Sequence, residues 1–190
     1  MLILKKLISH GTVRACFYHP EDKNKCVKVV LHKKYSYLLK KELDNNLLFQ
    51  EKLSLFVPKY YQLVDTNKGL GLETELIKDD HNQLSPRLVD YLKTKKTLSN
   101  ELINQFETFF SLLLKHHLWF YDFNLENFLI KTINKKEQLI FVDTKSYNRN
   151  NSWSFLKLEY IIPILAKIRM KRRIKRFYKR VEIPIPNTLE

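Results

Sequence analysis

Five polar side chains stand in or beside apolar stretches of the chain, at positions where they could act together on phosphate groups. Lys28 lies in the stretch "CVKVV", and Glu42 lies in the next periodic segment, where its carboxylate could pair with the lysine and fix its direction. Asp122 and Asn127 share the stretch "YDFNLENFLI", and Asp143 ends the stretch "LIFVD". Phosphoryl transfer requires charge around the phosphates and an oriented nucleophile, rather than covalent chemistry from the protein. Carboxylate and amide oxygens, such as those of Asp143 and Asn127, suit magnesium.

Each of these residues also has a purely structural interpretation. A lysine in a strand is commonly a solvated edge charge, and a lone acid such as Glu42 is typical of a helix surface. Asp122 and Asn127 could cap and brace their loop, and Asp143 could belong to a turn. The functional interpretation therefore depends on all five residues occurring in one chain.

The elements that must position these residues follow from the apolar periodicity. Residues 1–18 and 25–31 are predicted to be strands, with Cys26, Lys28 and Val30 on one face of the second. Helical spacing predicts a helix over residues 36–56, in which Leu39, Leu43, Leu47, Phe49 and Leu53 share a stripe and which ends before Pro58. Residues 59–76 are predicted to form a hairpin that turns at 67–69.

The second half of the sequence is predicted to be richer in helix. Residues 79–86 form a polar loop, and Ser99 caps a helix over residues 100–117 whose buried stripe includes Leu102, Phe106 and Leu113. "FLIK" and "LIFVD" are predicted to be strands around a polar turn, "TINKKEQ". The remaining chain is predicted to be helical to about Val181. The order predicts an α+β domain spanning residues 1–190, with a β-rich lobe at about 1–78, an α-rich lobe at about 79–181 and a tail at 182–190.

Composition limits the class of protein. The chain has 190 residues, of which 44% are hydrophobic, so it can bury a core. No apolar run approaches the roughly 20 residues of a membrane span. The N-terminal "MLILKKLISHG" has its apolar part before its lysines, unlike a signal peptide, so a cytoplasmic location is expected. Two cysteines, Cys16 and Cys26, provide neither a disulfide framework nor a zinc site, and small core residues are expected there.

The net charge of +14 favours an anionic partner. Ten Lys or Arg residues and three Glu residues lie between positions 157 and 190. Residues 167–180 could form a core-packed helix with a solvated basic face, or could bind an anionic membrane surface or a phosphorylated glycan, which would place the protein at the periphery of the inner membrane. A nucleic-acid partner is disfavoured because no nucleic-acid-binding motif accompanies the charge.

Several stretches resemble a known bacterial family. "GTVRACFYHPEDKNKCVKVV", "KKELDNN", "VPKYY" and "LENFLI" are similar to the YrbL family of the PhoP regulatory network, over roughly residues 5–180. "YDFNLENFLI" also resembles the catalytic-loop pattern His-Arg-Asp-x4-Asn of the protein-kinase-like superfamily. "FVDTK" resembles the strand that ends in the metal-binding Asp of Asp-Phe-Gly, and "CVKVV" resembles the Val-Ala-Ile-Lys strand.

The resemblance implies a minimal protein-kinase-like fold that uses ATP and Mg²⁺. It implies that Lys28, positioned by Glu42, binds the nucleotide phosphates beneath a covering loop, "SHGTVRAC", whose single glycine is Gly11. It implies further that Asp122 is the catalytic base, and that Asn127 and Asp143 are the metal ligands.

The sequence departs from the kinase pattern at several positions. Phe120 and Tyr121 replace the His and Arg of the catalytic loop, and Thr144 and Lys145 follow Asp143. Only 47 residues follow Asp143, and no Ala-Pro-Glu sequence occurs among them. These departures favour a small-molecule or saccharide acceptor, such as a cell-surface glycan precursor, over a protein. The alternative is a pseudokinase that keeps the fold and acts as a regulatory binding module.

Overall fold

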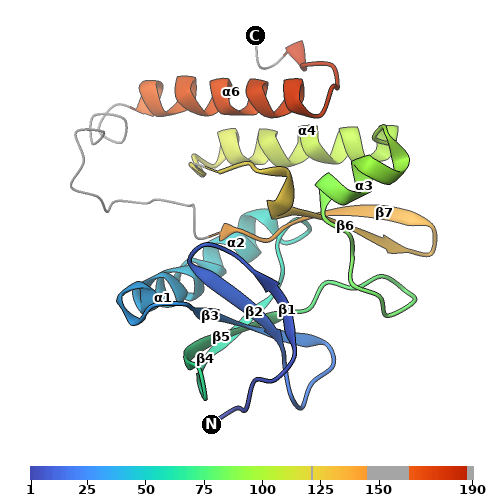
Figure 1. Cartoon of the computed structure of the whole chain (residues 1–190). Coiled ribbons are helices and arrows are strands. Elements are labelled where there is room, and N and C mark those ends of the chain that lie inside the picture. Colours follow the sequence, from blue (N-terminus) through green and yellow to red (C-terminus); the bar gives the residue numbers. More distant parts are fainter. Residues whose placement is uncertain (121, 145–162, 188–190) are drawn as a thin grey trace. The chain divides into compact units, whose positions relative to one another are not determined.

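The N-terminal unit, which comprises residues 1–85, contains a five-stranded antiparallel sheet (Figure 1). The computed structural model describes residues 1–120, 122–144 and 163–187. The strand order is β1-β2-β3-β5-β4, so β3 lies at the centre. The strands span Leu7–His10 (β1), Arg14–Tyr18 (β2), Lys25–Val30 (β3), Tyr60–Thr66 (β4) and Gly69–Glu75 (β5).

The first predicted strand, residues 1–18, is divided in the structure. The backbone N–H of Gly11 donates to the carbonyl of Arg14 at 2.8 Å, which closes a turn between β1 and β2. The prediction of a single strand was wrong, because Gly11, Thr12 and Val13 form a turn between two strands. The β4–β5 hairpin is confirmed, and Gly69 has a φ of +91° after its turn, a conformation that glycine adopts without steric cost.

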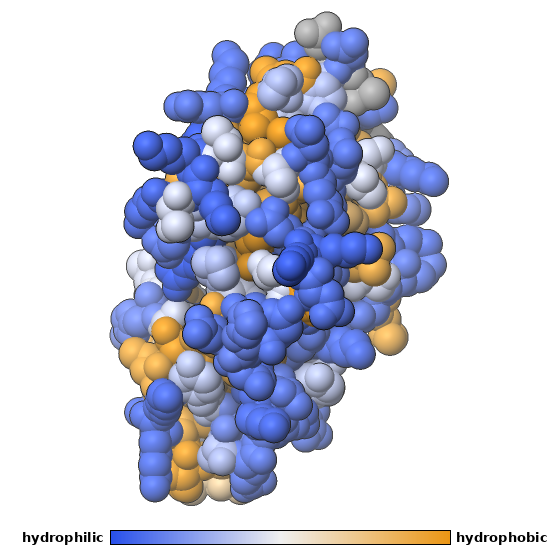
Figure 2. All heavy atoms as spheres, turned by 90° about the vertical axis from the view of Figure 1, so that its right-hand side faces the viewer, coloured by the Kyte–Doolittle hydropathy of each residue, from blue (hydrophilic) through white to orange (hydrophobic). Residues whose placement is uncertain are grey.

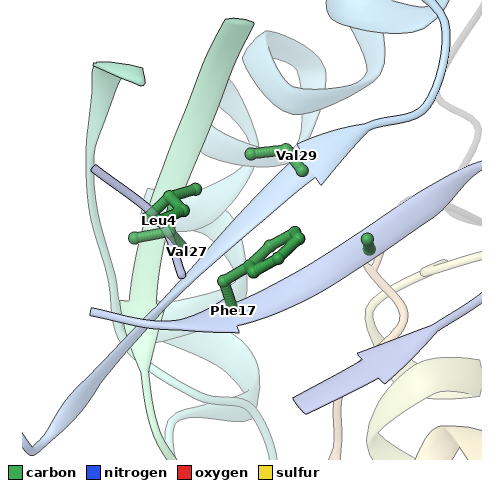
Figure 3. Close-up of a cluster of buried hydrophobic side chains, with 5 residues drawn as sticks. Leu4, Phe17, Val27 and Val29 are labelled. Atoms are coloured by element: carbon green, nitrogen blue, oxygen red, sulfur yellow. The ribbon is translucent and has the colours of Figure 1, made fainter. Parts of the chain in front are cut away.

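The two faces of the sheet carry separate hydrophobic clusters. Figure 3 shows Leu4, Phe17, Val27 and Val29 gathered on one face, where they pack together with Ala15. On the other face Leu39, from helix α1 (Ser36–Asp44), packs with Tyr60 and Leu72. Lys28 pairs with Leu72 across β3 and β5, so it belongs to the face that α1 covers. This confirms the predicted alternation along β3.

The predicted helix over residues 36–56 is two helices, α1 (Ser36–Asp44) and α2 (Asn46–Leu53), preceded by a short 3-10 turn at Lys33–Tyr35. The Asn45 side-chain amide donates to the carbonyl of Lys41 at 2.7 Å, so it competes with the helical hydrogen bond there. The buried positions Leu39, Glu42, Phe49 and Leu53 keep one helical stripe across the break. Leu47 lies beside that stripe and is 82% exposed, although the spacing predicted that it would be buried, whereas Phe49 is buried as predicted.

The C-terminal unit, residues 86–190, combines helices with a two-stranded hairpin. Ser99 caps α4 (Asn100–Lys115) as predicted, because its hydroxyl accepts from the backbone N–H of Leu102 at 3.3 Å. The helix before it, α3 (Leu88–Lys95), was not predicted. The polar turn between the strands is shorter than expected, with only Asn134 and Lys135 between them, both at positive φ. The elements are α3 (Leu88–Lys95), α4 (Asn100–Lys115), a 3-10 turn (Leu125–Asn127), β6 (Phe128–Ile133), β7 (Lys136–Phe141) and α6 (Pro163–Arg180).

A cluster of aromatic rings forms the core of this unit. Phe106 of α4 lies 5.3 Å from Phe128 of β6 and 4.9 Å from Phe177 of α6, measured between ring centroids. The helices α4 and α6 therefore pack against each other, as Figure 1 shows. The buried residues of α6 are Ala166, Met170, Ile174, Phe177 and Tyr178, and Val181 directly after the helix is also buried. Ile164 and Ile168 are exposed.

The fold is mixed α+β, as the sequence predicted. The predicted helical segment between residues 145 and 162 lies outside the described residues. On the face shown in Figure 2, hydrophilic residues cover most of the surface, with small hydrophobic patches between them. Among the helices that the structure describes, none combines the length and the hydropathy needed to cross a membrane.

Candidate functional site

A buried ion pair joins the central strand of the sheet to α1. The ammonium of Lys28 lies 2.9 Å from Oε1 of Glu42, and Glu42 is only 1% exposed. The ammonium also lies 5.1 Å from the centroid of the Tyr60 ring, within range of a cation–π interaction. The pairing that the spacing predicted is therefore present, and the direction of the Lys28 side chain is fixed.

Two further side chains share the Glu42 carboxylate. The guanidinium of Arg14 donates to Oε2, and the hydroxyl of Tyr60 donates to Oε1 at 3.0 Å. Arg14 was not predicted. The register could have indicated it, because Cys16 pairs with Lys28 and Arg14 lies two residues before Cys16, on the same face. Two cations from neighbouring strands therefore share the carboxylate of Glu42.

Two cysteines lie on the same face as Lys28. Cys26 Sγ is 3.1 Å from Oγ1 of Thr74, and a hydrogen bond from Cys16 lowers the pKa of the Cys26 thiol to about 7 despite its burial. The same hydrogen bond, together with burial, raises the pKa of Cys16 well above its ordinary value. The prediction of small core residues therefore describes how the two cysteines pack. It did not include the lowered pKa of the Cys26 thiol.

Gly11 lies in the turn between β1 and β2, the segment that resembles a phosphate-covering loop. Its φ is outside the positive range, and a Cβ added to it would lie 3.4 Å from the carbonyl oxygen of Arg14. The conformation of this turn therefore does not require glycine. A role at this position that only glycine can fill would be to let a ligand approach the backbone of the turn closely.

Asp122 is held in the loop before β6. The backbone N–H of Asn124 donates to Oδ1 of Asp122 at 3.1 Å, and the Asn124 side-chain amide donates to Oδ2 at 3.3 Å. Both oxygens of a half-buried carboxylate are thus oriented by one residue. The sequence analysis did not identify Asn124, although its position two residues after an aspartate is typical of an Asx turn.

Asn127 and Asp143 flank the same end of the β6–β7 hairpin. The pairing of Phe128 with Phe141 is extended by a hydrogen bond of 2.9 Å from the backbone N–H of Val142 to the carbonyl of Asn127. Asp143 follows directly and is 5% exposed. The side-chain amide of Asn127 also reaches the carbonyl of Asp122, at 3.5 Å. The hairpin thus brings together three of the predicted site residues, which are up to 21 positions apart in the sequence.

The donor chemistry of this group fits a magnesium ion that shares its coordination with phosphates. Mg²⁺ in nucleotide sites is commonly bound by one or two protein oxygens, with phosphates and water as the other ligands. Asn127 and Asp143 offer an amide oxygen and a carboxylate. Within the described parts of the chain, no cluster of three or more His, Cys, Asp or Glu residues could hold a metal by itself.

Solved structures with a similar fold include a kinase domain and the protein WbdD. Two mutant forms of the Mycobacterium tuberculosis PknI kinase domain align at 8% identity over 78% of this chain, with TM-scores of 0.52 and 0.53. The alignments cover 61% and 60% of those chains, so this chain spans about three fifths of their length. WbdD aligns at 16% identity with a TM-score of 0.51, over 83% of this chain and 36% of its own. The fold is therefore protein-kinase-like, as the resemblance implied.

The sequence comparisons identify the family directly. No curated protein sequence matches the chain. The family described as PhoP regulatory network protein YrbL matches residues 1–182, which is nearly the whole chain. The chain is therefore a member of the YrbL family of PhoP regulatory network proteins.

Proposed function

We propose that this protein is a phosphotransferase that uses ATP and Mg²⁺ and acts on a small or saccharide acceptor. The observation that carries the proposal is the buried Lys28–Glu42 ion pair, at 2.9 Å, on the central strand of the sheet. A surface lysine would not need a buried carboxylate to direct it, and burying that carboxylate would be costly without a compensating role. A directed ammonium is what binding of nucleotide phosphates requires.

The residues divide into two groups with separate tasks. Lys28, supported by Glu42 and Arg14, would hold the phosphates of ATP. Asn127 and Asp143 would hold the metal, which when bound neutralises charge on the phosphates. Asp122 would accept the proton of the acceptor hydroxyl, and the two hydrogen bonds from Asn124 keep its carboxylate in one orientation.

The acceptor is proposed to be small because the segment that protein kinases use for peptide docking is not recognisable. The residues after Asp143 are Thr-Lys rather than Phe-Gly, and no Ala-Pro-Glu sequence follows. We therefore propose a saccharide, such as a cell-surface glycan precursor, as the acceptor rather than a folded protein.

A regulatory binding module is the second candidate. It is favoured by the sharing of Glu42 between Lys28, Arg14 and Tyr60, because such a network also braces the sheet against α1 without any ligand. The single glycine of the β1–β2 turn favours it too, since fewer backbone amides could approach a phosphate closely.

Titration of the protein with ATP, in the presence and absence of Mg²⁺, tests the proposal. Wild type is expected to bind ATP more tightly with Mg²⁺, and Lys28→Met is expected to weaken binding at least about tenfold, as loss of a charged hydrogen-bond donor predicts. Glu42 keeps Arg14 and Tyr60 as partners in this variant, so the fold should persist. Lys40→Met, on the exposed side of α1, is the matched control. Failure of wild type to bind ATP under either condition would favour the regulatory module.

A further inference from the structure

A small pocket lies directly beside Asp122 in the C-terminal unit. It encloses about 120 Å³ and is lined by Asp122, Phe123, Asn124, Arg173, Arg176, Phe177 and Arg180. The three arginines follow one another at spacings of three and four residues along α6, so they lie on one face of that helix. No other acidic residue lines this pocket among the described residues, so three guanidinium groups surround one carboxylate.

The arginines are carried by a firmly held part of α6. Phe177, in the middle of their segment, lies 5.2 Å from Phe110 and 5.2 Å from Phe128, and it is 2% exposed. Phe128 follows directly on the loop that contains Asp122. The same aromatic core therefore positions both the loop and the basic face of the helix.

A chain of hydrogen bonds links the basic face to the carboxylate. Nη1 of Arg180 donates to Oδ1 of Asn124 at 3.2 Å, and the amide group of Asn124 donates to Oδ2 of Asp122 at 3.3 Å. Arg180 thus contacts the neutral amide rather than the carboxylate. Asp122 therefore does not neutralise the charge of Arg180, which together with that of Arg176 attracts an anion.

We propose that this pocket binds an anionic group of the acceptor, with phosphate as the preferred chemistry, and that it selects acceptors that already carry a phosphate. Guanidinium groups match the oxygens of a phosphate in a two-pronged geometry, which a lysine surface does not. The pocket has room for a group of a few heavy atoms, while the rest of the acceptor extends outside. This inference rests on the proposed function, because it assigns Asp122 to the acceptor hydroxyl.

The pocket differs from the general basic surface of the same helix. Arg172 and Lys179 are exposed on α6 but do not line the pocket. They have the same charges on the same element, and so they provide a control pair for non-specific electrostatic binding.

The test is calorimetric titration of the full chain with glucose 6-phosphate, and with glucose as its neutral counterpart, at about 150 mM salt, where charges about 8 Å apart or more are screened. Wild type is expected to bind the phosphate ester and not glucose. Arg176→Gln is expected to weaken binding about tenfold, and Arg173→Gln with Arg176→Gln about a hundredfold. Arg172→Gln with Lys179→Gln is expected to change the affinity by less than about twofold. The single Arg176→Gln variant decides the question if the double variant does not fold.

Three results would overturn the inference. The first is that the Arg172→Gln, Lys179→Gln control weakens binding of glucose 6-phosphate as much as the Arg173→Gln, Arg176→Gln variant does. The second is that wild type binds glucose as tightly as glucose 6-phosphate. The third is that wild type does not bind the phosphate ester but binds tightly to vesicles of phosphatidylglycerol. The last result would assign the basic face to a membrane surface. Phosphate-ester binding by a protein that does not bind ATP would retain the pocket and reject the phosphotransferase. ATP binding without phosphate-ester binding would retain the phosphotransferase and reject the pocket.

Discussion

Arg14 and Lys28 donate to the two oxygens of one carboxylate, that of Glu42 on α1. The two cations come from neighbouring strands and would repel each other without the carboxylate between them. Glu42 is therefore needed for the local structure as well as for the direction of Lys28. Experiments on this network must separate the effect on folding from the effect on ligand binding.

Replacing the shared carboxylate should destabilise the protein. Glu42→Gln leaves two cations around a neutral, buried amide, and loss of one partner from a buried ion pair typically costs about 3–5 kcal/mol. Urea denaturation should show a corresponding decrease in the free energy of unfolding. Glu51→Gln removes an exposed acid from the next helix and should change it by less than about 1 kcal/mol. Equal stability of the two variants would contradict the buried network.

The metal assignment predicts a specific loss. Asp143→Asn keeps the size of the side chain and removes its charge, so ATP affinity should no longer depend on Mg²⁺. The affinity measured without Mg²⁺ should change little. A magnesium-dependent gain in affinity that survives in this variant would exclude Asp143 as a ligand.

The base assignment predicts a loss of turnover without a loss of binding. Asp122→Asn should reduce phosphoryl transfer at least about a hundredfold, the usual contribution of a general base, while ATP affinity stays within about twofold. Glu126→Gln is the control, because it alters an exposed carboxylate in the same loop. A decrease in both variants would indicate disturbance of the loop rather than loss of a base.

Two glycines are expected to respond differently to alanine. A Cβ on Gly71 would lie 2.6 Å from Cγ1 of Val27 and 3.0 Å from Cγ2 of Thr66, so Gly71→Ala should cost about 1–3 kcal/mol in unfolding free energy. Gly11→Ala meets no such contact and should be tolerated. Reduced ATP affinity in a normally stable Gly11→Ala protein would indicate that phosphates approach the β1–β2 turn closely.

The Cys26 thiol should ionise near neutral pH. Its pKa of about 7 lies below the ordinary value of 9.0, so absorbance of the thiolate near 240 nm should rise around pH 7. Removing the hydrogen-bond donor with Cys16→Ala should move this transition to higher pH. Because the pKa is lower in the folded state, ionisation of Cys26 should add stability as the pH rises from about 7 to 9, and this stability is lost as the pH falls back through 7. A transition unchanged by Cys16→Ala would contradict the pairing of the thiols.

The sequence by itself determined the elements whose signals are local. Alternation along β3 placed Lys28 on the same face as Cys26, and Ser99 marked the start of α4. Five site residues could be chosen because their types and order match a phosphoryl-transfer pattern. The interruption between α1 and α2 at Asn45 was missed, since the apolar spacing continues across it.

The tertiary structure alone decided which side chains share a site. The sheet register placed Arg14 beside Lys28, and no spacing in the sequence indicates that one carboxylate serves both. Packing of Phe177 in the aromatic core selected which arginines of α6 lie beside Asp122 and which lie in solvent. The charged residues of a helix can be counted from a sequence. The direction in which their side chains point depends on which face of the helix is buried. In α6 that face is buried by residues more than 45 positions away in the sequence.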